Sequence, residues 1–152
     1  MLPVEFALER YTEKAARVMF FAAYQARKFG SPCIQPEHIL LAIVREDARL
    51  IKRFIRPHQS MASIWRQIIE NTTMREQIPP GVALAISPEG EELLDLAATE
   101  IEELGLKVVG TEHLLLGLLR QDKGLAAETL KASGVNFAGV REQVARSVRT
   151  SE

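Results

Sequence analysis

Residues 109–120 read Val-Gly-Thr-Glu-His-Leu-Leu-Leu-Gly-Leu-Leu-Arg, and this stretch decides the fold of the chain. Most of it is apolar on nearly every side of a helix, and a helix of that kind is buried. The same pattern occurs 75 residues earlier, where residues 35–45 read Gln-Pro-Glu-His-Ile-Leu-Leu-Ala-Ile-Val-Arg. Similarity at a fixed offset indicates an internal repeat. Ala42 and Gly117 hold the same place in the two copies, and a small residue there lets another helix approach closely.

The repeat continues on both sides of the buried helix without a gap, over residues 11–54 and 86–129. Apolar residues ahead of the buried helix recur at spacings of three, four and seven residues, which marks one face of an α-helix. Thr12 and Ser87 are suited to cap the start of this first helix. Gly30 and Gly105 are suited to the left-handed turn after its end.

Each copy reads as four helices, with a short extended link between the first and the second. The third helix carries Leu50, Ile51, Phe54 and Ile55, or Leu125, Ala126 and Leu130 in the second copy. The fourth carries Ile64, Trp65, Ile68 and Ile69, or Val140, Val144 and Val148. No strand is predicted, because the segment Val82-Ala-Leu-Ala-Ile86 is short and lacks a partner.

The sequence therefore predicts an all-α fold in which two pseudo-symmetric four-helix repeats pack as one domain over residues 1–152. The boundaries are about 9–72 for repeat one, about 73–86 for the linker with its Pro79-Pro80-Gly81, and about 87–149 for repeat two. Four-helix units of about 75 residues are marginal alone, so the repeats should share a core. The residues predicted to be buried at the repeat junction are Leu40, Leu41, Leu115 and Leu116.

Charge and cysteine content predict a cytoplasmic protein whose partners are neither nucleic acid nor a membrane. The net charge is −1, although residues 1–76 carry +4 and residues 77–152 carry −5. Cys33 is the single cysteine, so no disulfide can form within the chain, and a reducing compartment is expected. Without a basic partner nearby in the chain, Cys33 is interpreted as a structural thiol.

With Gly105 before it and Asp122-Lys-Gly124 after it, the segment 109–120 resembles the second repeat of the N-terminal domain of Clp-type AAA+ unfoldases. Residues 35–45 resemble the first repeat in a weaker form, and the resemblance covers about residues 9–149. It implies a non-catalytic protein-recognition module, without cofactor or metal, that binds substrates or adaptor proteins for a Clp ATPase. No Gly-x-x-x-x-Gly-Lys-Ser/Thr phosphate loop occurs in the sequence.

The resemblance also implies a binding site. In family members that handle arginine-phosphorylated proteins, the Glu of each Glu-His pair contacts the modified guanidinium, and those positions here are Glu37 and Glu112. We expect Arg10 and Thr12, near the start of the first helix, to hold the phosphate in repeat one. In repeat two, Glu89 and its neighbour Glu91 stand where such members have basic residues. Phosphoarginine recognition is therefore expected at repeat one, and Glu37 is the stronger candidate.

Two other functions stay open from the residues alone. The Glu37-His38 and Glu112-His113 pairs could form a metal or hydrolytic site, but adjacent helix residues project about 100° apart and do not converge on one ion. A structural interpretation places each Glu at a helix start and each His in packing or a hydrogen bond at the repeat junction. A DNA-binding regulator is the second alternative, and its candidate surface is a basic stripe of Arg49, Lys52, Arg53 and Arg56.

Aromatic residues concentrate in the first half of the chain: Phe6, Tyr11, Phe20, Phe21, Tyr24 and Trp65. Those of the first helix cannot all face the core, since Val18 and Met19 occupy that face. They form either an exposed patch that binds proteins, or a cluster covered by Trp65.

Overall fold

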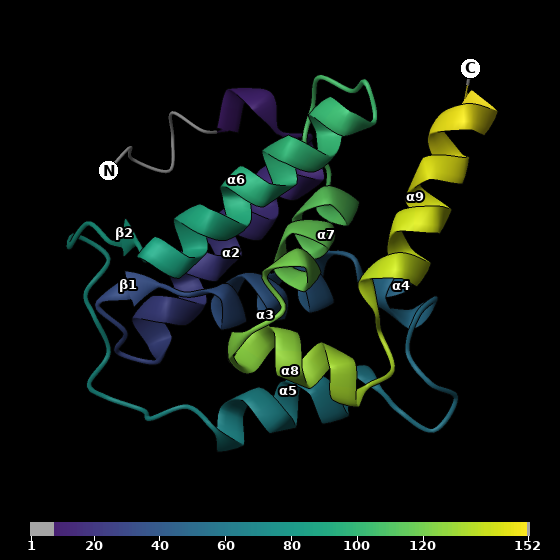
Figure 1. The fold of residues 1–152 in the computed structure, drawn as a ribbon. Coiled ribbons are helices and arrows are strands. Elements are labelled where there is room, and N and C mark those ends of the chain that lie inside the picture. The colour runs from purple at the N-terminus through teal and green to yellow at the C-terminus, as the bar shows by residue number, and fades with distance from the viewer. Residues whose placement is uncertain (1–7, 152) are drawn as a thin grey trace.

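Two similar sets of four α-helices make up the computed structural model, which describes residues 8–151 (Figure 1). The first set comprises α2 (Glu13–Lys28), α3 (Pro36–Glu46), α4 (Ala48–Lys52) and α5 (Met61–Glu70), and a 3-10 helix η1 (Leu8–Arg10) precedes it. The second set comprises α6 (Pro88–Glu103), α7 (Thr111–Gln121), α8 (Gly124–Ala132) and α9 (Phe137–Ser151). Helices α2 and α6, and likewise α3 and α7, start and end 75 residues apart. The predicted all-α repeat fold is confirmed.

Helix ends lie where the capping residues place them. The Oγ1 atom of Thr12 accepts a hydrogen bond of 3.1 Å from the Ala15 amide, and the Oγ atom of Ser87 accepts one of 2.9 Å from the Gly90 amide. Gly30 has a φ of +72°, and a Cβ there would lie 2.5 Å from the carbonyl oxygen of Glu76. The linker after α5 therefore packs directly on the turn that ends α2.

The prediction that residues 82–86 contain no strand is wrong. Strand β1 (Cys33–Ile34) pairs in parallel with β2 (Ala85–Ile86), and Tyr11 forms a parallel bridge with Val109. The two pairings are related by the 75-residue offset. In each of them, the link that follows the first helix of one repeat pairs with the segment that precedes the first helix of the other repeat. The partner of each strand therefore belongs to the other repeat, and a local reading of residues 82–86 could not find it.

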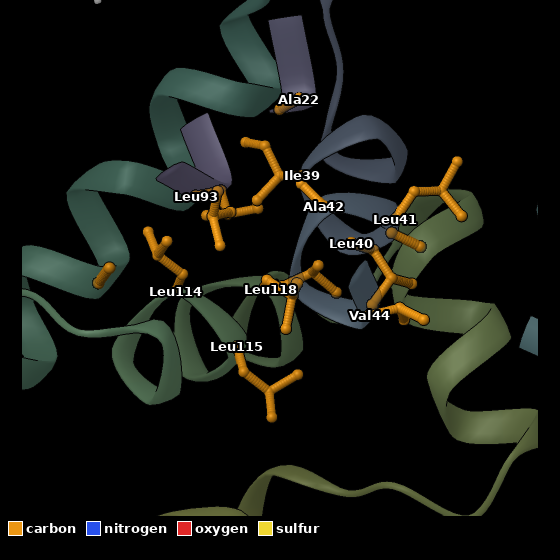
Figure 2. Close-up of a cluster of buried hydrophobic side chains, with 14 of the residues drawn as sticks. Ala22, Ile39, Leu40, Leu41, Ala42, Val44, Leu93, Leu114, Leu115 and Leu118 are labelled. Carbon is orange, nitrogen blue, oxygen red and sulfur yellow. The ribbon is translucent and has the colours of Figure 1, made fainter. Parts of the chain in front are cut away.

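The core lies where the apolar helices α3 and α7 meet (Figure 2). Leu40, Leu41, Leu115 and Leu116 are all 0% exposed, which confirms their predicted burial. Gly117 lets α7 approach α6 closely, since a Cβ at this position would lie 2.5 Å from the Leu93 carbonyl oxygen. The expected role of the small residue in α7 is therefore confirmed.

The remaining helices differ between the repeats. Helix α4 has 5 residues and ends at Lys52, so Phe54 and Ile55 lie in the turn after it and not in the predicted third helix. Helix α9 has 15 residues, whereas its counterpart α5 has 10. Within residues 8–151, no helix combines the length and the apolar character that a membrane crossing requires.

Candidate functional site

Each Glu-His pair lies at the start of a buried helix, and the histidine closes that start. His38 Nδ1 accepts a hydrogen bond of 2.9 Å from the Gln35 amide, and His113 Nδ1 accepts one of 2.8 Å from the Gly110 amide. Both rings are buried, at 2% and 4% exposure. This geometry agrees with the structural interpretation of the histidines, because each ring satisfies a backbone donor that the helix leaves free.

The two glutamates of these pairs line two pockets at equivalent places in the repeats. Glu37 lines a pocket of about 290 Å³, and Glu112 lines one of about 410 Å³. The 75-residue offset relates further lining residues of the two pockets, in the pairs Ser31 and Leu106, Thr72 and Ser147, and Thr73 and Val148. The repeat thus produces two related pockets, one with a polar wall and one with a more apolar wall.

Arg10 and Thr12 lie beside repeat two, which corrects the expectation that they stand next to Glu37. The Thr12 amide donates to the Val109 carbonyl at 2.9 Å, and the Val109 amide donates to the Arg10 carbonyl at 2.8 Å. Val109 is three residues before Glu112. Phe29, at the other end of α2, lines the Glu37 pocket, and a 16-residue helix is about 24 Å long. Strand exchange therefore brings the start of α2 next to the link that leads into α7 and Glu112.

Glu37 faces the start of α6 in the same crossed manner. The Ser87 amide donates to the Ile34 carbonyl at 3.0 Å, which brings the first turn of α6 next to β1. Burial raises the pKa of Glu37, and the negative charge of Glu89 raises it further. Glu89 was expected to oppose an anion bound at Glu112. Its charge instead acts on Glu37.

Asp47 and Cys33, two further polar residues near the starts of α7 and α3, have ordinary structural contacts. The Asp47 carboxylate accepts a hydrogen bond of 2.6 Å from Thr111 Oγ1, which ties the end of α3 to the start of α7. Cys33 Sγ accepts a hydrogen bond of 3.3 Å from Gln35 Nε2, and burial raises the pKa of its thiol. Among residues 8–151, no group of three or more His, Cys, Asp or Glu side chains is placed to hold a metal ion.

The aromatic residues of α2 divide between the surface and a covered position. Phe20 and Tyr24 are 58% and 47% exposed. Lys28 Nζ lies 5.5 Å from the ring centroid of Tyr24, and Arg45 Cζ lies 4.1 Å from that of Phe21. Part of the aromatic cluster therefore faces solvent, as the first of the two alternatives predicts. Phe6 lies outside the described residues.

Acidification from pH 6.5 toward pH 4 is expected to destabilise the fold through His38. Burial lowers the pKa of His38 to about 4, whereas an unfolded histidine titrates near 6.5. Between these values the unfolded chain binds the proton and the folded chain does not, so stability falls as the pH falls. Burial also lowers the pKa of His113, which acts in the same direction. The raised pKa of Glu37 acts in the opposite direction.

Urea unfolding at several pH values measures this effect, with His38→Asn as the control. The asparagine side chain can still accept from the Gln35 amide, but it does not titrate. The variant should lose less stability than the parent between pH 6.5 and pH 4.5. Equal losses would show that His38 does not cause the pH dependence.

Known protein families and relatives match this chain over both repeats. The family described as "Clp repeat (R) N-terminal domain" matches residues 10–132 and 85–152. A curated relative, chaperone protein ClpC1 of the rice chloroplast (Oryza sativa subsp. japonica), is 32% identical over 148 residues. That alignment covers 97% of this chain and 16% of the relative, so the chain corresponds to about a sixth of the longer protein.

Solved structures share the fold at lower sequence identity. The N-terminal domain of the chaperone ClpD from Arabidopsis thaliana has a TM-score of 0.67 at 19% identity, and the match covers 95% of this chain and 96% of that one. A ClpV N-domain in complex with a VipB peptide has a TM-score of 0.74 at 17% identity, with 97% and 92% covered.

Proposed function

Because the chain belongs to the family of Clp repeat N-terminal domains, we propose that it is a recognition module which binds substrate or adaptor proteins for a Clp-type ATP-dependent unfoldase. The module is non-catalytic and acts as one domain, with repeat one at about 9–72, the linker at about 73–86 and repeat two at about 87–149. Peptide recognition by this fold has a precedent in the ClpV N-domain, which was solved with a VipB peptide.

One observation supports this function most directly. Two carboxylates, Glu37 and Glu112, stand in the first turns of α3 and α7, and each lines a pocket that opens to the surface. The Glu112 side chain is 38% exposed, so a ligand can reach it. A carboxylate at such a position can pair with a guanidinium, and charge-assisted contacts of this kind are among the stronger polar ones. We therefore place the arginine or lysine of a client at these glutamates.

The surroundings of the two glutamates favour Glu112 for an arginine that carries a phosphate. The start of α2, with Thr12 and Arg10, lies on the Glu112 side, and free backbone amides at a helix start bind anions. Glu89 lies on the Glu37 side and opposes an anion there. The phosphoarginine preference expected at repeat one is therefore reassigned to the mixed site that contains Glu112 from repeat two and Arg10 and Thr12 from repeat one.

Glu112→Ala is expected to weaken binding of an arginine-phosphorylated peptide about tenfold, the effect of losing one charge-assisted contact. Glu37→Ala should weaken it less. Fluorescence anisotropy with the modified peptide and its unmodified form measures both effects. Glu128→Ala, which removes an exposed carboxylate from α8, is the control variant.

Two results would count against this proposal. Equal losses in the Glu37 and Glu112 variants would contradict the reassignment, because the surroundings would then not distinguish the two sites. Failure of the parent protein to bind either peptide would remove both glutamates as a client site.

A further inference from the structure

The larger pocket lies at the junction of the repeats and is built from both of them. It has a volume of about 410 Å³ and is bounded by α4 of repeat one and by the start of α7 and the middle of α9 from repeat two. Leu50, Phe54, Leu106 and Val144 give it an apolar wall. The pocket at Glu37 has Ser31 and Thr73 at positions equivalent to Leu106 and Val148, so its wall is the more polar of the two.

The lining of this pocket carries side chains of both charges. Arg53, an exposed residue at the end of α4, belongs to the lining, and its neighbours Arg49, Lys52 and Arg56 are also exposed. No ion pair is found for these four cations among the described residues. Glu112 lines the pocket at the helix start. A ligand in this pocket therefore meets a cation from the end of α4, an anion from the start of α7 and apolar side chains from both repeats.

His113, a residue of the same pocket, has a buried ring nitrogen for which the described part of the chain offers no hydrogen-bond partner. Because its Nδ1 accepts from the Gly110 amide, the proton of the neutral ring is on Nε2. Burial lowers the pKa of His113, which keeps the ring neutral. Nε2 is buried and has no hydrogen-bond partner among the described residues. Buried donors are rarely left unsatisfied, so this N–H points to an acceptor that the described residues do not supply.

We propose that this pocket binds a client or adaptor peptide in which a bulky apolar side chain lies between an arginine and an acidic residue. The apolar side chain enters the pocket, and the acidic residue pairs with Arg53 and its neighbours. A peptide carbonyl accepts from His113 Nε2 once the entering side chain has displaced the groups that bury this atom. The arginine pairs with Glu112, and in this respect the inference rests on the proposed function. Because Arg53 and Glu112 carry opposite charges and come from different helices, the two charged residues of the peptide set the direction in which it lies.

The probe is a fluorescein-labelled peptide with an Arg-Leu-Asp core in a Gly-Ser background, measured by anisotropy. Replacing its Leu by Ala, or its Asp by Lys, should weaken binding about tenfold, which corresponds to the loss of one good contact. On the protein, Gln143→Trp fills the pocket from an exposed position of α9, and Arg53→Glu reverses the charge of its rim. Both should weaken binding to a similar extent.

Matched variants test whether the effect belongs to the pocket. Ala138→Trp on α9 and Arg66→Glu on α5 are exposed positions outside it, and they should leave binding within about twofold. His113→Asn keeps an acceptor for the Gly110 amide and removes the Nε2 donor, so it should weaken binding, whereas His38→Asn should not. Circular dichroism verifies that each variant is folded.

Two outcomes would overturn the inference. The first is a Leu-to-Ala peptide, or a Gln143→Trp protein, that binds as well as its parent. The second is a duplex DNA that displaces the peptide through the cations of α4 and binds equally well to the Gln143→Trp variant. If the phosphorylated arginine peptide still binds while the Arg-Leu-Asp peptide does not, the inference fails and the proposed function stands. If neither binds, both fail.

Discussion

Replacing Leu115 with alanine is expected to lower the free energy of unfolding by about 2–5 kcal/mol, the usual range for a buried leucine. Leu115 is 0% exposed in α7, a helix that packs against α3, α6, α8 and α9. A cavity at this position removes contacts in a helix that both repeats share. The mutant retains its helix propensity, since alanine favours helices, so the loss reports packing. Urea unfolding of parent and mutant measures the difference.

Two further variants identify the cause of that loss. Leu40→Ala, at the equivalent position in α3, is also 0% exposed and should cost a similar amount. Val82→Ala, at a residue that is 48% exposed in the linker, should cost far less. A Leu115→Ala protein as stable as the parent would show that α7 is not the centre of the core.

Glu100→Ala is expected to cost about 3 kcal/mol, at the lower end of the range for breaking a buried ion pair. The Glu100 side chain is 0% exposed, and its carboxylate oxygens lie 2.9 Å from Arg120 Nη1 and 2.7 Å from Arg141 Nε. These contacts join α6 to α7 and α9. The two arginines are 35% and 27% exposed and can reach water and Glu103 after the substitution, which limits the loss.

The internal repeat supplies the control for this substitution. Gln25 is the equivalent residue in α2, and it is also buried, at 6% exposure. Glu100→Gln keeps the shape and one acceptor, so it should cost less than Glu100→Ala. If the two variants were equally destabilised, the charge of Glu100 would be the important property. If neither were destabilised, the ion pairs would contribute nothing to holding α9 in place.

The sequence predicts most of the helical fold, because the apolar spacing and the residues at helix ends act on neighbours within a few residues of the chain. Thr12, Ser87, Gly30 and Gly105 act through residues within one turn of them, so the sequence is enough to place the ends of α2 and α6. The burial of α7 follows from its residues 114–119, which are apolar on nearly every side of the helix. The sequence does not predict the end of α4. Phe54 and Ile55 pack against the core from the turn after this helix, so apolar residues continue at helical spacing although the helix has ended.

The candidate site could be predicted only in part. The resemblance to Clp N-terminal domains implies Glu37 and Glu112 as site residues, and both line pockets. Their neighbours could not be assigned, because the chain pairs Tyr11 with Val109 and Ile34 with Ile86 across the repeats. If each repeat formed its own site, Arg10 would lie near Glu37 and Glu89 near Glu112. In the structure Arg10 lies beside Val109, three residues before Glu112, and Glu89 lies near Glu37. Arg53 and Leu106 join the larger pocket from different repeats, and no sequence pattern connects them.

The crossed strand pairs have a consequence for how such a chain can arise and come apart. Ile34 of repeat one pairs with Ile86, which precedes repeat two. The equivalent pair joins Val109 of repeat two to Tyr11, which precedes the first helix of repeat one, so each half gives the other the same contact. Such reciprocal contacts are those of an isologous homodimer. The molecule can thus be regarded as two subunits fused into one chain, with the linker as the fusion point. Halves produced by cutting the linker are the natural fragments for complementation, because each holds the strand that the other lacks.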